Sequence, residues 1–232
     1  MARRTILLLA TLLLSVLAAS PAEAENSKSS ACMGKPYSYA GLQSETKAHG
    51  VAATLSPIAA PAVADGHVGG WIGVGGANVG PGGVTEWLQT GFASFDHEQR
   101  SRMYYEVTLP GAAPKYVELS ESIEPGEAHH FSVLEMGSRK SWWRVWVDHK
   151  PVSPPIHLPG SHGTFFPQAI AENWNGGTGT CNAYSYSFSD ITLAQTSGGK
   201  WRPLTASSVL QDAGYKVVRS SAAARTFVAT SL

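Results

Sequence analysis

The sequence has 232 residues, with 17 basic and 17 acidic side chains and a formal net charge of zero. The charges are balanced, and they form neither a basic stripe nor an acidic block along the sequence. This argues against a nucleic-acid partner and against a highly charged, solvated tail. Charged residues make up only 15% of the chain, and glycine and aromatic residues are frequent, as expected of a secreted β-protein.

The N-terminal segment 1–24 has the pattern of a secretory signal peptide. A basic start precedes the short apolar run 5–19, and small residues follow at Ala22 and Ala24. The apolar run is short for a membrane span, which leaves a retained helical anchor as the weaker alternative. We therefore predict a secreted, extracellular protein with no membrane attachment after signal cleavage.

Two cysteines, Cys32 and Cys181, occur in the sequence. In an oxidising compartment they are expected to form a disulfide bond, and two unpaired thiols are the alternative. No Cys/His spacing resembles a zinc site, so we predict no metal.

Residues 25–36 are predicted to form a flexible lead, and residues 37–232 a single domain. Short β-like runs follow one another with Gly/Pro-rich breaks between them. The only predicted helix is 206–213. The predicted strands are 50–55, 67–74, 85–92, 103–109, 115–120, 129–135, 142–148, 165–173, 184–194, 200–205, 215–219 and 226–230. Many short strands without alternating helices indicate an all-β fold, a two-sheet antiparallel jelly-roll sandwich.

The strand that contains EWLQTGF raises a question about Gln89. Side chains alternate between the two faces of a strand, so Gln89 shares a face with Trp87 and Gly91, opposite Leu88 and Phe92. An uncharged amide on a half-buried strand is either a working part of a site or a packed hydrogen-bonding group. The sequence leaves both interpretations open.

Two further strands show informative alternation. In 103–109, Tyr105 falls on the apolar face, whereas Tyr104 and Glu106 fall on the polar face. In 142–148, one face carries core residues and the other is aromatic and basic. This second face is either the wall of a groove for sugars or peptides or an exposed cross-strand ladder. Its residues are Trp142, Arg144 and Trp146.

The run FFPQAIAENW places an amide and a carboxyl on one face of a strand. Gln168 and Glu172 lie on the same side, about 13 Å apart by strand rise. A glutamate in an apolar groove is expected to have a raised pKa and to act as an acid or base under mildly acidic conditions. A glutamine opposite it could donate hydrogen bonds to a developing oxyanion.

The ordered runs GGWIGVGG, EWLQTGF, YYEVTLPG, FPQAIAE and DITLA resemble the bacterial branch of the glutamic peptidases, the eqolisin family. The resemblance covers about residues 66–195. It implies a concanavalin A-like jelly roll and an acid-acting endopeptidase that needs no metal or cofactor. In that family a glutamate activates water and a glutamine stabilises the tetrahedral intermediate.

The resemblance assigns roles position by position. It makes Gln89 the oxyanion-stabilising residue, and it matches Trp71, Tyr105 and Glu106 to strands that line the substrate cleft. The catalytic glutamate has two possible registers. Without a gap, Gln168 occupies its position; with one inserted residue, Glu172 does. An insertion flips the following side chains to the other face, which favours the ungapped register.

Three functions remain open at this stage. The first is a peptide hydrolase in which Gln89 and Glu172 act together, with Trp142, Arg144 and Trp146 lining the cleft. The second is a binding module that has lost the catalytic glutamate and holds a polypeptide or polysaccharide. The third is a structural extracellular domain. In each case we expect a monomer without a cofactor.

Overall fold

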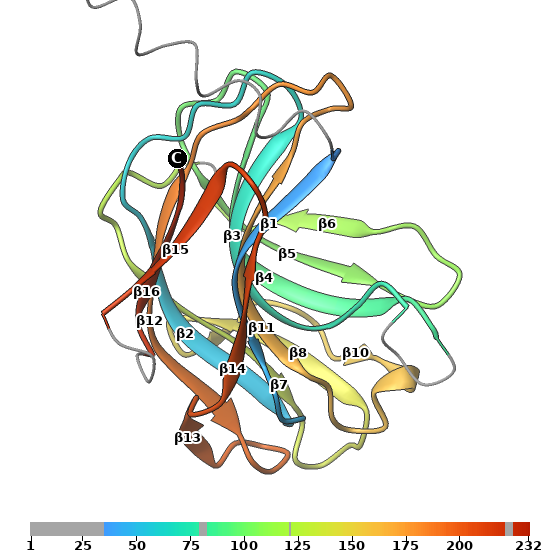
Figure 1. The fold of residues 1–232 in the computed structure, drawn as a ribbon. Helices are drawn as coiled ribbons and strands as arrows, with labels where there is room; N and C mark the ends of the chain where they lie inside the picture. The colour runs from blue at the N-terminus through green and yellow to red at the C-terminus, as the bar shows by residue number, and fades with distance from the viewer. Residues whose placement is uncertain (1–34, 79–82, 121, 221–224) are drawn as a thin grey trace, which may run out of the picture.

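The computed structural model describes residues 35–78, 83–120, 122–220 and 225–232. In these ranges the secondary structure is almost entirely β, in two antiparallel sheets with one short 3-10 helix, η2 (Pro159–Ser161) (Figure 1). The predicted all-β jelly-roll sandwich is confirmed.

The first sheet has seven strands, and the N-terminal strand lies beside two strands from the C-terminal half (Figure 1). Their order across the sheet is β14 (Ser207–Gln211), β1 (Tyr37–Ser44), β11 (Pro167–Trp174), β3 (His67–Gly76), β4 (Glu86–Phe95), β5 (Arg102–Thr108) and β6 (Lys115–Glu118).

The second sheet has nine strands. Seven of them follow one path: β10 (Ile156–His157), β8 (Trp142–Val147), β7 (His129–Glu135), β2 (Gly50–Pro57), β12 (Ser185–Ala194), β16 (Phe227–Ser231) and β15 (Tyr215–Arg219). The remaining two pair with strands of this path: β13 (Trp201–Pro203) with β12, and β9 (Lys150–Pro151) with β8.

Alternate side chains of the two sheets fill the space between them. Phe92 of β4 packs edge-on against Phe131 of β7, with ring centroids 5.1 Å apart. Gly70 of β3 leaves room for the Tyr186 ring of β12, since a Cβ atom on Gly70 would lie 2.6 Å from that ring. Burying one such ring contributes on the order of 2–3 kcal/mol, so these contacts fix how the sheets face each other.

The predicted helix 206–213 is wrong, because Ser207–Gln211 forms strand β14 at the edge of the first sheet. Pairing with β1 satisfies its backbone groups and overrides its local helix preference. Strand β1 was also missed. Ser38, Ala40 and Gly41 of this strand are all buried, and they lie on both of its faces. The segment therefore lacks a clean alternation of apolar and polar residues.

Several predictions fall outside the described residues. They concern the signal peptide 1–24, nearly all of the lead 25–36, and Cys32. The disulfide with Cys181 therefore stays a prediction. Within the described ranges, no helix is long and apolar enough to cross a membrane.

Candidate active site

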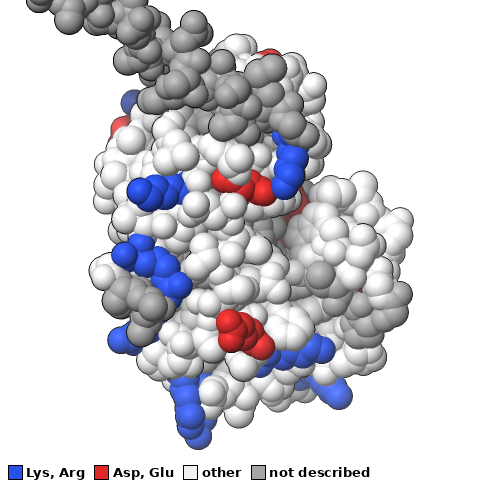
Figure 2. Space-filling model, viewed as in Figure 1, with Lys and Arg blue, Asp and Glu red and all other residues white. Residues whose placement is uncertain are grey.

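The outer face of the seven-stranded sheet carries a cleft of about 670 Å³. This face is the one opposite the core, and Figure 2 shows the surface hollowed beside the lobe on its right. Trp71 and Ile170 line the cleft, and they belong to a second cluster of buried residues, which also contains Ala93 and Tyr104. An open trough of this size accommodates several residues of an extended polymer.

One cross-strand row carries three of the polar groups of the cleft. Gln168 of β11 pairs with Gly73 of β3, Gly73 pairs with Gln89 of β4, and Gln89 pairs with Glu106 of β5. Gly73 is required here, because a Cβ atom on it would lie 2.8 Å from the Cβ of Gln89. The two glutamines therefore face each other across a bare strand, about 10 Å apart at the backbone.

Glu172 lies on the same face, four residues further along β11, and two neighbours hold its carboxylate. The Trp71 indole donates a hydrogen bond from Nε1 to Oε2 at 3.3 Å, and His67 Nε2 lies 3.1 Å from Oε1. The Glu172 side chain is only 13% exposed. This carboxylate is positioned at the cleft wall rather than free in solvent.

Tyr104 lies beneath the cleft and holds the side-chain amide of Gln89. Gln89 Nε2 donates a hydrogen bond to the Tyr104 hydroxyl oxygen at 3.1 Å. Burial, and then the charges of Glu172 and Glu106, raise the pKa of Tyr104 well above its usual value, so its hydroxyl stays neutral. A glutamine amide has two N–H donors. Tyr104 takes one and orients the group, which leaves the second N–H for a ligand in the cleft.

Glu106 is the second carboxyl of the cleft. Trp87 donates a hydrogen bond from Nε1 to Glu106 Oε1 at 2.9 Å. Burial raises the pKa of Glu106 above its usual value; the Trp87 bond opposes this shift, and the charge of Glu172 adds to it. Glu106 therefore keeps its proton to a higher pH than an exposed glutamate does.

The structure brings most of the predicted site residues together. Trp71, Gln89, Glu106, Gln168 and Glu172 all line this cleft. Strand β11 pairs continuously with β3 from Pro167 to Trp174, so Gln168 and Glu172 both lie on the face of the sheet that carries the cleft. Gln168 is the β11 residue in register with Gln89.

Four predicted cleft residues lie elsewhere, and their placement in the cleft was wrong. Tyr105 points into the core, because its neighbours Tyr104 and Glu106 take the outer face. The other three belong to β8 of the nine-stranded sheet. They alternate with the buried residues of that strand and therefore lie on the outer face of the nine-stranded sheet. They are Trp142, Arg144 and Trp146.

Several residues of the cleft were not predicted from the sequence. Tyr37 and Tyr39 come from the unpredicted strand β1, and Leu210 comes from β14. His67 was visible only as the first residue of a predicted strand. Tyr104 had a detectable signal, since alternation in 103–109 already placed it on the face of Glu106. Among the described residues, no group of three or more metal-binding side chains comes together.

The two-sheet jelly roll of this chain is similar in fold to solved structures of glutamic peptidases. No protein-family model matches the chain, and no curated protein matches it in sequence. The similarity appears among solved structures. Scytalido-glutamic peptidase with a transition state analog inhibitor has a TM-score of 0.57 and 15% identity, over 83% of this chain and 97% of that chain.

Two more solved structures agree. Scytalido-glutamic peptidase with a peptide-based transition state analog has a TM-score of 0.56 and 16% identity, covering 84% of this chain and 98% of that one. SCP-B, a member of the eqolisin family in complex with the tripeptide Ala-Ile-His, has a TM-score of 0.53 and 17% identity, with the same coverage. At these identities the similarity concerns the fold.

Proposed function

We propose that the chain is an exported peptide hydrolase that acts at acidic pH through Gln89 and the carboxyls of the cleft. The observation that carries the proposal is the convergence of one amide and two carboxyls, Gln89, Glu106 and Glu172, on a single cleft. A polypeptide is preferred to a polysaccharide as ligand, because two of the structures of similar fold hold peptide-based ligands.

The proposed reaction is the addition of water to a peptide carbonyl. The ionised Glu172 carboxylate takes a proton from the water while the water oxygen forms a bond to the carbonyl carbon. The carbonyl electrons move onto oxygen, which accepts a hydrogen bond from the second N–H of Gln89. Collapse of the intermediate breaks the C–N bond, and Glu106, protonated, gives its proton to the leaving amine.

The pH profile and Glu172→Gln test this proposal. Cleavage of extended peptides is expected in mildly acidic solution and should fall as pH rises, because Glu106 loses its proton above its raised pKa. Glu172→Gln keeps the shape of the side chain but removes the base, and it should lower kcat by at least about 10²-fold. Mass spectrometry of peptide mixtures across pH measures both effects.

The matched control is Glu45→Gln, an exposed glutamate outside the cleft, which should cleave like the unmodified chain. Equal cleavage rates in the Glu172→Gln variant and in this control would remove Glu172 from the mechanism. Cleavage that rises toward neutral pH would remove Glu106 as the acid.

A second candidate function is peptide binding without hydrolysis, and Gln168 favours it. The β11 residue in register with Gln89 is an amide, which cannot act as a base. Under this alternative the unmodified chain binds peptides at acidic pH and leaves them intact. Gln168→Glu would then place a carboxyl opposite Gln89 and is expected to introduce cleavage.

The control for Gln168→Glu is Gln43→Glu, which adds the same charge one strand further from Gln89. Cleavage gained by Gln168→Glu and not by Gln43→Glu would support the binding function. If both variants bind peptide and neither cleaves it, the missing carboxyl at position 168 does not explain the absence of activity.

A further inference from the structure

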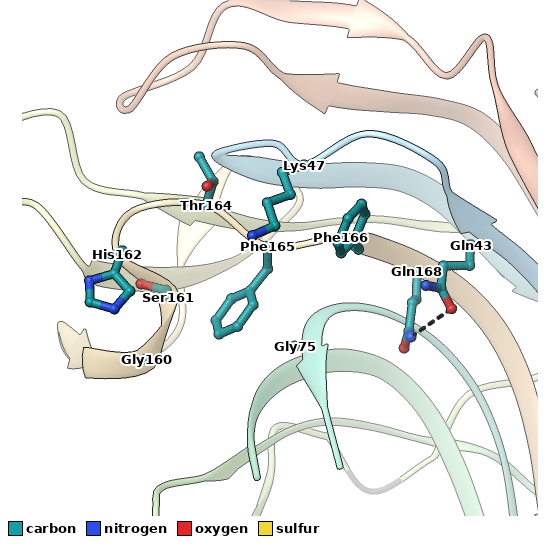
Figure 3. A pocket seen from close by; sticks show the side chains of 10 residues that line it. All are labelled: Gln43, Lys47, Gly75, Gly160, Ser161, His162, Thr164, Phe165, Phe166 and Gln168. Atoms are coloured by element: carbon teal, nitrogen blue, oxygen red, sulfur yellow. Dashed lines mark hydrogen bonds between the residues drawn. The ribbon is translucent and has the colours of Figure 1, made fainter. Parts of the chain in front are cut away.

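A second, smaller pocket of about 100 Å³ lies next to the cleft. The two share Gln168 and Gly75 in their walls, so a chain bound in the cleft passes the mouth of the pocket. Figure 3 shows Lys47, Phe166, Gln43 and Gln168 on one side of the pocket and His162 on the other. The volume equals that of about three water molecules, which suits the end of one side chain.

The pocket has a distinctive charge. Lys47 is its permanently charged lining residue, and no aspartate or glutamate lines it. The Lys47 ammonium lies 5.5 Å from the centroid of the Phe166 ring, a cation–π arrangement that positions the ammonium without neutralising it. Within the described part of the chain, Lys47 makes no ion pair.

Two amides complete the polar wall. Gln168 Nε2 donates a hydrogen bond to Gln43 Oε1 at 3.4 Å, which is long and weak (Figure 3). Within the described residues, the Gln43 amide nitrogen has no hydrogen-bond partner. An ammonium beside amide N–H donors is complementary to a carboxylate and repels a cation.

We propose that this pocket is a subsite that selects peptides with an acidic side chain. The inference rests on the proposed binding of peptides in the cleft. Gln168 lies two strands from Gln89, about 10 Å away, which is the length of about three extended residues. The selected aspartate or glutamate therefore lies about three residues from the peptide bond held at Gln89.

The test is a set of ten-residue peptides that differ at one position, which carries Glu, Gln or Lys and is moved along the peptide. Binding is measured by fluorescence anisotropy at about pH 6, where a peptide glutamate is ionised. At one position we expect Glu to bind about two- to fivefold more tightly than Gln, and Lys more weakly. Lys47→Glu should reverse this order.

The control is Lys150→Glu, an exposed lysine of β9 in the other sheet, which should keep the preference for Glu. Binding with equal affinity for Glu, Gln and Lys peptides, or an order unchanged by Lys47→Glu, overturns the subsite and leaves the proposed hydrolysis standing. A preference for Glu without cleavage of any peptide overturns the hydrolysis and leaves the subsite. Absence of all peptide binding overturns both.

Discussion

Gln89→Ala is expected to lower kcat for peptide cleavage by about 10²- to 10³-fold, with a small change in KM, because it removes a donor that acts mainly in the transition state. The amide of Gln89 has one N–H that donates to Tyr104, and its second N–H is left to donate to a bound peptide. Alanine supplies neither. The measurement is steady-state cleavage of one peptide by purified wild-type and variant protein at the acidic optimum.

A structural role for Gln89 predicts a different pattern. Losing one hydrogen bond to Tyr104 should cost about 1 kcal/mol of folding free energy, too little to unfold the domain. Gln195→Ala, an exposed glutamine outside the cleft, serves as the matched control and should retain full activity. A folded Gln89→Ala variant that cleaves at the wild-type rate would show that the Gln89 amide has only a structural role.

Trp143→Ala is expected to lower the free energy of unfolding by about 3–5 kcal/mol, the largest effect on stability predicted for this chain. Trp143 is fully buried between the sheets and packs near Phe165. Its indole also donates a hydrogen bond to Ser161 Oγ at 3.1 Å. Replacement by alanine removes this donor. Urea titration followed by circular dichroism gives the difference in free energy.

The neighbouring Trp142 provides the control, because it lies on the outer face of the same strand. There it stacks on Arg139 and His157, and its replacement by alanine should cost no more than about 1 kcal/mol. Similar losses in both variants would contradict the assignment of the two faces of β8. The comparison also tests whether the face of β8 that carries Trp142, Arg144 and Trp146 is the outer face of the nine-stranded sheet, away from the cleft.

The alternation of apolar and polar residues within a single strand correctly predicted which side chains face the core. It placed Leu88 and Phe92 inward and Trp87 and Gln89 outward, as the structure does. It also predicted a buried Tyr105, whereas the motif match assigned Tyr105 to the cleft. The structure follows the alternation, because adjacent residues of a strand cannot both face one side.

What the sequence could not supply was the pairing of distant strands. Both sheets have an outer face with aromatic residues, so the pattern of Trp142 and Trp146 does not reveal which sheet holds the cleft. Strands β1 and β14 contribute Tyr39 and Leu210 only because they pair with each other at one edge. Such contacts are set by tertiary packing rather than by local preference.

The central claim, that Gln89 and Glu172 act on one ligand in this cleft, is tested most directly by a crystal structure with a peptide-based transition state analog. The account predicts the analog extended along the seven-stranded sheet, with its tetrahedral oxygens about 3 Å from the Gln89 amide and the Glu172 carboxylate. An analog bound on the nine-stranded sheet, or in the cleft but out of reach of both side chains, would contradict it.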